Sequence, residues 1–117
     1  MSVVSKTIKY LLDKNISVST AESCTGGLLA AEFTAVSGIS KIYKTGLITY
    51  SNDSKIKNLK VKPSTIKRYG AVSRQVCAQM CLHLHKISKS QLTFSTTGVA
   101  GPNGCLLYTS PSPRDPE

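Results

Sequence analysis

The sequence has no tryptophan, only two phenylalanines and no long hydrophobic run among its 117 residues. Proteins that bind single-stranded nucleic acid stack the bases on several aromatic side chains, so this composition argues against such a platform. No apolar stretch approaches the roughly 20 residues that a transmembrane helix requires, and we expect no membrane partner. Residues 1–6 lack the apolar centre of a signal peptide, which indicates a cytoplasmic protein.

Acidic residues are also scarce. The chain has 6 acidic and 15 basic residues and a formal net charge of +9, which favours anionic partners. The lysines are spread from Lys6 to Lys89, and the densest region, between Lys55 and Lys67, is spaced like a solvated face. We therefore prefer a small anionic ligand to nucleic acid, and we keep a basic nucleic-acid-binding protein as an alternative.

The four cysteines do not form a recognisable metal-binding set. Cys77 and Cys81 are four residues apart on a predicted helix, which is the spacing of two core residues on one face. His83 and His85 are two apart and so point to different sides of that helix, and no second cysteine pair completes a zinc site. In a cytoplasmic chain we expect reduced cysteines and no metal ion.

The stretch from residue 16 to residue 36 contains a strand, a sharp turn and a helix. Residues 16–19 alternate apolar and polar side chains, as a strand does, whereas apolar residues from 28 to 36 recur at the three- and four-residue steps of a helix. Residues 22–27 therefore form the turn between them. Helices and strands alternate along the chain, which predicts one domain with a layered α/β fold, a mostly parallel sheet flanked by helices.

The other elements follow from apolar spacing and capping residues. We predict a first helix over residues 4–12, a strand over 42–50, a short helix capped by Ser51, Asn52 or Asp53, a helical turn over 63–70, a helix capped by Ser73 and a strand over 91–95. Gly46 within the second strand indicates a bulge or a close backbone approach. Residues 96–104 are predicted to be a glycine-rich loop.

The predicted turn carries groups that suit an acyl-transfer or anion-binding site. Ser23, Cys24 and Thr25 supply two hydroxyls and a thiol. Thr25, Gly26 and Gly27 would present free backbone N–H groups at a helix start, where an anion, or an oxygen that becomes one, is stabilised. The same pattern also suits a simple N-cap followed by a tight turn.

A nucleophile at this turn needs a base, and Lys55 is a candidate. Both histidines lie on the long predicted helix, whereas Lys55 follows a strand end, as Ser23 does. Ligands of parallel α/β sheets bind where the carboxyl ends of the strands meet, so strands ending near residues 20, 50 and 95 would bring these groups together. A lysine can act as a base if burial lowers its pKa. Cys24 stays an alternative nucleophile, since a thiolate is stronger.

Three blocks of the sequence resemble one known family. They are Ala21–Gly27 (Ala-Glu-Ser-Cys-Thr-Gly-Gly), Gly46–Lys55 and Ser95–Pro102. In this order they are similar to the CinA C-terminal domain, the nicotinamide-nucleotide amidase (PncC-like) family. The resemblance covers about residues 3–104, and three ordered blocks are far more specific than one glycine motif.

The resemblance implies an amidohydrolase that converts nicotinamide mononucleotide to nicotinate mononucleotide and ammonia. It implies Ser23 as the nucleophile, Lys55 as the general base and Tyr50 as a supporting catalytic tyrosine, with no metal or organic cofactor. The small-molecule nucleotide and the oxyanion would contact a further set of residues: Cys24, Thr25, Gly26, Gly27, Thr96, Thr97, Gly98 and Gly101. A non-catalytic nucleotide-binding or regulatory module is the main alternative.

The resemblance stops after residue 104. We expect residues 1–104 to be an incomplete amidase domain and residues 105–117 to be an unrelated, disordered tail, whose prolines preclude a helix and weaken any strand. The last strands and the last helix of the family would then be missing, and the chain would be poorly soluble and inactive. The sequence leaves open whether the complete protein forms a homo-oligomer.

Overall fold

The computed structural model describes residues 2–98 and 105–111 of the chain. Five α-helices, one short 3-10 helix and four strands make up this described part. In sequence order they are α1 (Val3–Asp13), β1 (Val18–Glu22), α2 (Leu28–Thr34), η1 (Ile39–Lys41), β2 (Tyr43–Ile48), α3 (Asn52–Leu59), α4 (Pro63–Tyr69), α5 (Arg74–Ser88), β3 (Leu92–Gly98) and β4 (Cys105–Pro111).

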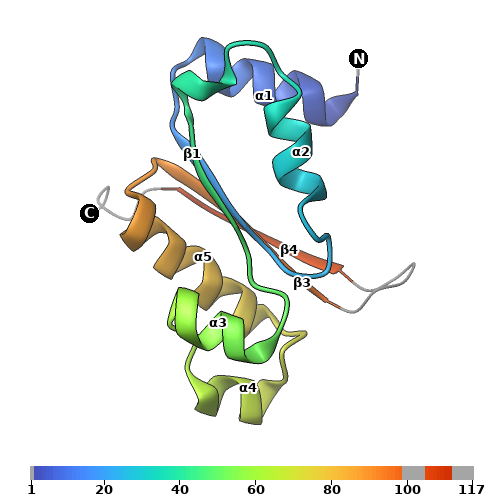
Figure 1. Cartoon of the computed structure of the whole chain (residues 1–117), viewed down its shortest axis with the longest axis vertical. Coiled ribbons are helices and arrows are strands. Elements are labelled where there is room, and N and C mark those ends of the chain that lie inside the picture. The colour runs from blue at the N-terminus through green and yellow to red at the C-terminus, as the bar shows by residue number, and fades with distance from the viewer. Residues whose placement is uncertain (1, 99–104, 112–117) are drawn as a thin grey trace.

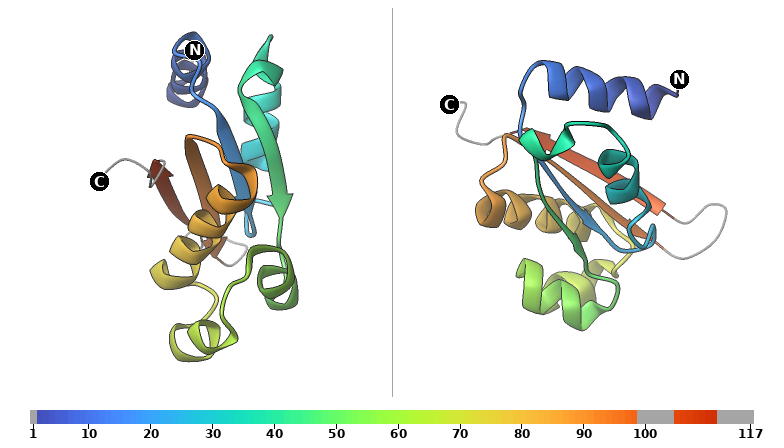
Figure 2. Two further views of the ribbon diagram at one scale, coloured as in Figure 1. Left: turned by 90° about the vertical axis from the view of Figure 1, so that its left-hand side faces the viewer. Right: turned by 45° about the horizontal axis from the view of Figure 1, so that its top comes forward.

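The strands form one sheet with the order β2-β1-β3-β4. β1 pairs in parallel with β2 and with β3, whereas β4 pairs antiparallel with β3. Helices α1 and α2 lie on one side of the sheet, and α3, α4 and α5 lie on the other (Figure 1). The right-hand view of Figure 2 shows the same arrangement with the sheet between the two groups of helices. The predicted α/β fold with a mostly parallel sheet is confirmed.

The core beneath α1 and α2 forms from apolar residues with helical spacing. The side chain of Ser2 begins α1 by accepting a hydrogen bond from the Ser5 N–H at 3.1 Å. This start turns Ile8 and Leu11, which are three residues apart, toward the sheet. The buried members of this core are Ile8, Leu11, Val18, Phe33, Ile39 and Ile42.

The core on the opposite side depends on α5, which Ser73 caps by accepting from the Val76 N–H at 3.2 Å. Its buried members are Ala21, Leu59, Val61, Val76, Met80 and Leu84. Cys77 and Cys81 are buried on the same helix face, and their sulfur atoms contact the hydroxyls of β3. The predicted core positions of these two cysteines are confirmed, as is the Ser73 cap.

Strand β4 differs from the prediction of a disordered tail. Residues 105–111 pair with β3 over its whole length, from Gly98 opposite Cys105 to Leu92 opposite Pro111. Pro111 is compatible with this strand because β4 lies at the edge of the described sheet, where a proline need not donate to a second neighbour. Residues 112–117 lie outside the described part. That residues 105–117 are unrelated in sequence to the family stays a prediction.

The predicted close approach at Gly46 is present. The hydroxyl of Tyr43 lies 2.6 Å from the hydroxyl of Thr20, and both hydroxyls lie close to the place where a Cβ atom of residue 46 would be. A Cβ atom at position 46 would collide with the Tyr43 hydroxyl and press on Thr20. Glycine is therefore required here by the space that the two hydroxyls occupy.

We expect Gly46→Ala to lower the free energy of unfolding by about 1–3 kcal/mol, the usual cost of inserting a methyl group into filled space. Urea denaturation followed by circular dichroism measures this difference. In a Tyr43→Phe background the same alanine should cost less, because the colliding hydroxyl is gone. Equal costs in the two backgrounds would show that the Tyr43 hydroxyl is not the obstacle.

Candidate active site

The structure brings Ser23 and Lys55 into direct contact. The Lys55 Nζ donates a hydrogen bond to the Ser23 Oγ at 3.0 Å, across 32 residues of sequence. Both side chains are buried, with exposed fractions of 3% for Ser23 and 2% for Lys55. The sequence predicted this meeting from the two strand ends.

The pairing of β1 with β2 explains the contact. Glu22 lies opposite Ile48 in the parallel register, and the Thr49 N–H donates to the Glu22 carbonyl at 2.8 Å. The chain therefore leaves both strands at the same edge. The Ser51 side chain then caps α3 by accepting from the Ser54 N–H at 3.0 Å, which places Lys55 at the end of the first helical turn.

Tyr50 contributes its main-chain carbonyl to this pair. The Lys55 Nζ donates to that carbonyl at 3.0 Å, and the Ser23 hydroxyl donates to it at 3.4 Å. The Tyr50 side chain, in contrast, is 63% exposed. The phenol that the family resemblance suggested as catalytic is thus on the surface, and the structure places the carbonyl of this residue beside the Ser23 hydroxyl and the Lys55 amine.

Burial changes the acid–base behaviour of Lys55. Its removal from water lowers the pKa of this amine below the ordinary value of 10.5. The Nζ donates to two neutral oxygens, the Ser23 hydroxyl and the Tyr50 carbonyl. The neutral amine is therefore easier to reach than in an exposed lysine, and this is the form that accepts a proton.

The helix start at α2 differs from the expected anion site. The Glu22 carboxylate, only 1% exposed, accepts from the backbone N–H groups of Gly27 at 3.1 Å, Leu29 at 2.8 Å and Ala30 at 2.8 Å. The Gly26 N–H donates to the Ser23 carbonyl at 3.1 Å. The expectation of free N–H groups at Gly26 and Gly27 is wrong, because a side chain of the protein already satisfies this end of the helix.

Sequence reasoning missed the role of Glu22. It was the single acidic residue of the turn, placed directly before a glycine-rich helix start. An acidic side chain at that place is a signal for helix capping, since carboxylates interact favourably with the first turn of a helix. The strand pattern alone gave no indication that this residue would be buried.

Thr96 and Thr97 lie in β3, although the sequence placed them in a loop. Both are β-branched residues that suit a strand, and β4 pairs with them. Thr96 Oγ1 accepts from the Ser23 N–H at 3.3 Å, whereas the Thr97 hydroxyl donates to the Ala71 carbonyl at 2.9 Å. Only Thr96 therefore contacts the turn that carries Ser23.

The other three predicted site residues are Cys24, Gly98 and Gly101. Gly98 is the last residue of β3, and Gly101 lies outside the described residues. Cys24, half-buried beside Ser23, is disulfide-bonded in this structure. A sulfur in a disulfide is not a thiolate, so in this state Cys24 cannot act as a nucleophile. The expectation that all cysteines are reduced is contradicted.

Thr49 is a buried residue at the same sheet edge. It is 1% exposed, and its hydroxyl has no hydrogen-bond partner among the residues that the structure describes. Sequence reasoning gave it no role. A buried hydroxyl without a partner lowers stability, because it lost its hydrogen bonds to water on folding.

We expect Thr49→Val to raise the free energy of unfolding by about 1 kcal/mol, since a methyl group replaces an unpaired hydroxyl. Urea denaturation is the measurement. Thr93→Val is the matched control, because the Thr93 hydroxyl is buried in the same sheet but donates to the Cys81 carbonyl at 3.2 Å. This control should lose stability. A loss in Thr49→Val as well would mean that its hydroxyl has a partner in solution.

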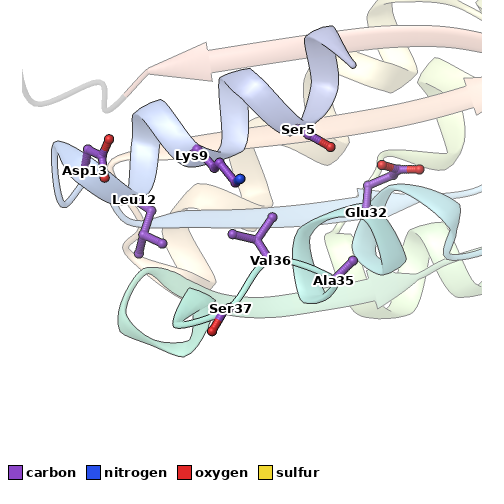
Figure 3. Close-up of a pocket in the computed structure, with 8 residues that line it drawn as sticks. All are labelled: Ser5, Lys9, Leu12, Asp13, Glu32, Ala35, Val36 and Ser37. Atoms are coloured by element: carbon purple, nitrogen blue, oxygen red, sulfur yellow. The ribbon is translucent and has the colours of Figure 1, made fainter. Parts of the chain in front are cut away.

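A surface cavity of about 470 Å³ lies elsewhere, between α1 and the end of α2 (Figure 3). Lys9 and Asp13 reach it from α1, and Glu32 reaches it from α2. None of the predicted site residues lines it.

Within the described residues, no cluster of three or more histidine, cysteine or acidic side chains could hold a metal ion. None of the described helices has the length and apolar character that crossing a membrane requires.

The fold and the buried pair define a layered α/β protein with a serine–lysine contact at the carboxyl edge of its sheet. The model of the family described as CinA C-terminal domain matches residues 1–107. The chain belongs to the CinA C-terminal domain family, as its three sequence blocks predicted.

Curated relatives carry the name competence-damage inducible protein. The chain is 52% identical to the relative from Clostridium novyi (strain NT) and 48% identical to that from Acetivibrio thermocellus, each over 96 residues. These matches cover 82% of this chain and 23% of each relative. The chain therefore spans about a quarter of the length of the curated relatives that it matches.

Solved structures of the CinA superfamily share the fold. A superfamily protein from Escherichia coli matches with a TM-score of 0.81 and 29% identity, covering 92% of this chain and 72% of that chain. A competence/damage inducible protein from Agrobacterium tumefaciens matches with a TM-score of 0.80 and 31% identity, covering 96% and 85%. These similarities support the architecture that the strand pairing gives.

Proposed function

We propose that this chain carries the catalytic centre of an amidohydrolase that deamidates nicotinamide mononucleotide. The observation that carries the proposal is the 3.0 Å contact between Lys55 Nζ and Ser23 Oγ, both buried. A module that only binds a nucleotide, or a basic protein that binds nucleic acid, has no need of a buried lysine held against a hydroxyl. The nucleotide substrate is suggested by the family resemblance.

The first half of the reaction follows from the hydrogen bonds of Lys55. In its neutral form the amine keeps one N–H on the Tyr50 carbonyl and turns its lone pair to the Ser23 hydroxyl. It takes the Ser23 proton while Oγ attacks the carboxamide carbon of the substrate. The protonated amine then gives this proton to the leaving nitrogen, and ammonia departs from an acyl-enzyme ester.

The second half repeats these steps with water. Lys55, neutral again, accepts a proton from a water molecule as its oxygen attacks the ester carbon. The Ser23 oxygen leaves and takes the proton back from the amine, which releases nicotinate mononucleotide and restores the pair. Gly26 and Gly27 direct their N–H groups to protein acceptors, so these two groups are not the donors that stabilise the oxyanion of the tetrahedral intermediates.

Ser23→Ala should abolish ammonia release from nicotinamide mononucleotide and leave the affinity for the nucleotide nearly unchanged. The change removes only the attacking oxygen, so binding contacts stay in place. The assay uses the 117-residue chain and, beside it, the same chain joined after residue 104 to the C-terminal segment of another CinA-family protein. Activity in Ser23→Ala near that of the parent would reject Ser23 as the nucleophile.

The rate should also rise with pH through an ionisation that belongs to Lys55. Burial lowers the pKa of Lys55 below 10.5, and the neutral amine is the active base, so kcat/KM should increase up to that lowered pKa and level off above it. Lys55→Arg should lose this pH limb and be as inactive as Lys55→Ala, because a guanidinium stays protonated. Substantial activity in Lys55→Arg would leave the residue only a role as a positive charge.

A further inference from the structure

A row of hydrogen bonds connects the backbone of Ser23 to the buried carboxylate of Glu22. The Ser23 N–H donates to Thr96 Oγ1 at 3.3 Å, and Thr96 Oγ1 lies 3.0 Å from Thr25 Oγ1. The Thr25 hydroxyl donates to Glu22 Oε1 at 2.6 Å, the shortest contact of the row. Three segments of the chain, from β1, the turn and β3, are joined in this way.

Donor counting fixes the direction of every proton in this row. Four donors converge on the Glu22 carboxylate, which therefore acts only as an acceptor. A threonine hydroxyl has one proton. The Thr25 proton is committed to Glu22, so its oxygen accepts the proton of Thr96. The Thr96 oxygen in turn accepts the Ser23 N–H.

We propose that Glu22 is a positioning residue for Ser23 that acts through Thr25 and Thr96. The proposal rests on the hydrolase function proposed above, because there Ser23 is the reacting group. The Glu22 carboxylate accepts hydrogen bonds from backbone N–H groups of the first turn of α2. Through the hydroxyls of Thr25 and Thr96 it also fixes the peptide group of Ser23. The nucleophile is thereby fixed between the helix and β3.

In the same geometry Thr25 and Thr96 support the Ser23 turn and do not bind the substrate. Their hydroxyl protons point along the row toward Glu22, and neither is available to donate to a phosphate or to an oxyanion. A carboxylate as deeply buried as Glu22 requires these donors, because a buried charge without hydrogen bonds is strongly unfavourable. The row is therefore maintained with or without a substrate.

The positions of Ser23 and Lys55 explain why this matters for rate. Lys55 reaches Ser23 from α3, while the row holds Ser23 from α2 and β3. A shift of the Ser23 turn would lengthen the contact that transfers the proton. Misplacement by about 1 Å costs on the order of 100-fold in rate in enzymes generally.

Thr96→Val and Thr96→Ser test the proposal, in the same two chains as the Ser23 assay. Valine breaks the row with little change in volume, whereas serine keeps the hydroxyl. We expect Thr96→Val to lower kcat on the order of 10- to 100-fold with KM changed less than about twofold, and Thr96→Ser to restore kcat. Thr93→Val is the matched control in the same strand; its hydroxyl bonds to α5, so kcat should be unchanged.

A second readout does not depend on the substrate. Phenylmethylsulfonyl fluoride labels an activated serine, and mass spectrometry gives the rate of labelling at Ser23. This rate should fall in Thr96→Val and in Glu22→Gln, and recover in Thr96→Ser. Glutamine keeps an oxygen that can accept from Thr25 but loses the charge and the acceptor of the Ala30 N–H, so it weakens the row that Thr96→Val breaks. The double variant of Glu22→Gln and Thr96→Val should therefore be no slower than the slower single variant.

The outcomes separate this inference from the proposed function. If Ser23 is labelled in a Lys55-dependent way but no ammonia is released, the proposed substrate is wrong. The labelling rates of the variants then test the positioning role by themselves. A rise in KM with unchanged kcat in Thr96→Val would make Thr96 a substrate-binding residue and overturn the proposal. An unchanged rate of Ser23 labelling in Thr96→Val would also overturn the proposal. If Glu22→Gln does not fold, Thr96→Val alone tests the positioning role.

Discussion

The parallel pairing of β1 with both β2 and β3 is the constraint on which the site depends. All five residues of β1 are buried. Residues 19–22 pair in continuous register with β2, and residues 18–21 pair with β3. The chain therefore emerges from β1 and β2 at one edge, where Ser23 and Tyr50 follow the strands and Thr96 lies near the end of β3. Lys55 and Thr96, which are 32 and 73 positions from Ser23 in the sequence, come within hydrogen-bond distance of it in this way.

Two buried ionisable side chains lie on either side of this edge, and they are satisfied differently. Glu22 faces α2 and receives four hydrogen bonds, three of them from backbone N–H groups. Lys55 comes from α3 on the other side and donates to a hydroxyl and a carbonyl. Successive residues of an extended chain face opposite sides, so Glu22 and Ser23 separate the two environments. Each of the two groups has its hydrogen-bond partners on its own side of the edge.

The sequence predicted much of this arrangement because the signals were local. Ser51 and Ser73 precede apolar helical patterns, and a hydroxyl at that place caps a helix whatever the tertiary structure. The meeting of Ser23 and Lys55 followed from a rule about strand ends in parallel sheets. Gly46 indicated close packing because a strand interior disfavours glycine unless space requires it.

The failures share a physical cause, which is that each depends on a side-chain contact, a strand pairing or a chain path that the local residue pattern does not determine. Free N–H groups at Gly26 and Gly27 were a reasonable expectation until the Glu22 side chain folded back onto them. Thr96 and Thr97 read as the beginning of a loop because their strand neighbour, β4, came from a stretch with several prolines. The exposure of the Tyr50 ring, likewise, depends on how the chain turns between β2 and α3.

A lysine base makes the chemistry of the site dependent on how the protein covers it. Desolvation is the cause of the lowered pKa of Lys55, so water that reached the amine would raise that pKa toward 10.5 and protonate the base. The cover is α3, which the Ser51 cap holds at its start and which buries Leu59 at its end. Local opening of this eight-residue helix would therefore reduce the fraction of Lys55 in the neutral form before the sheet itself unfolds. Burial of α3 and the availability of the neutral amine are in this sense one property of the fold.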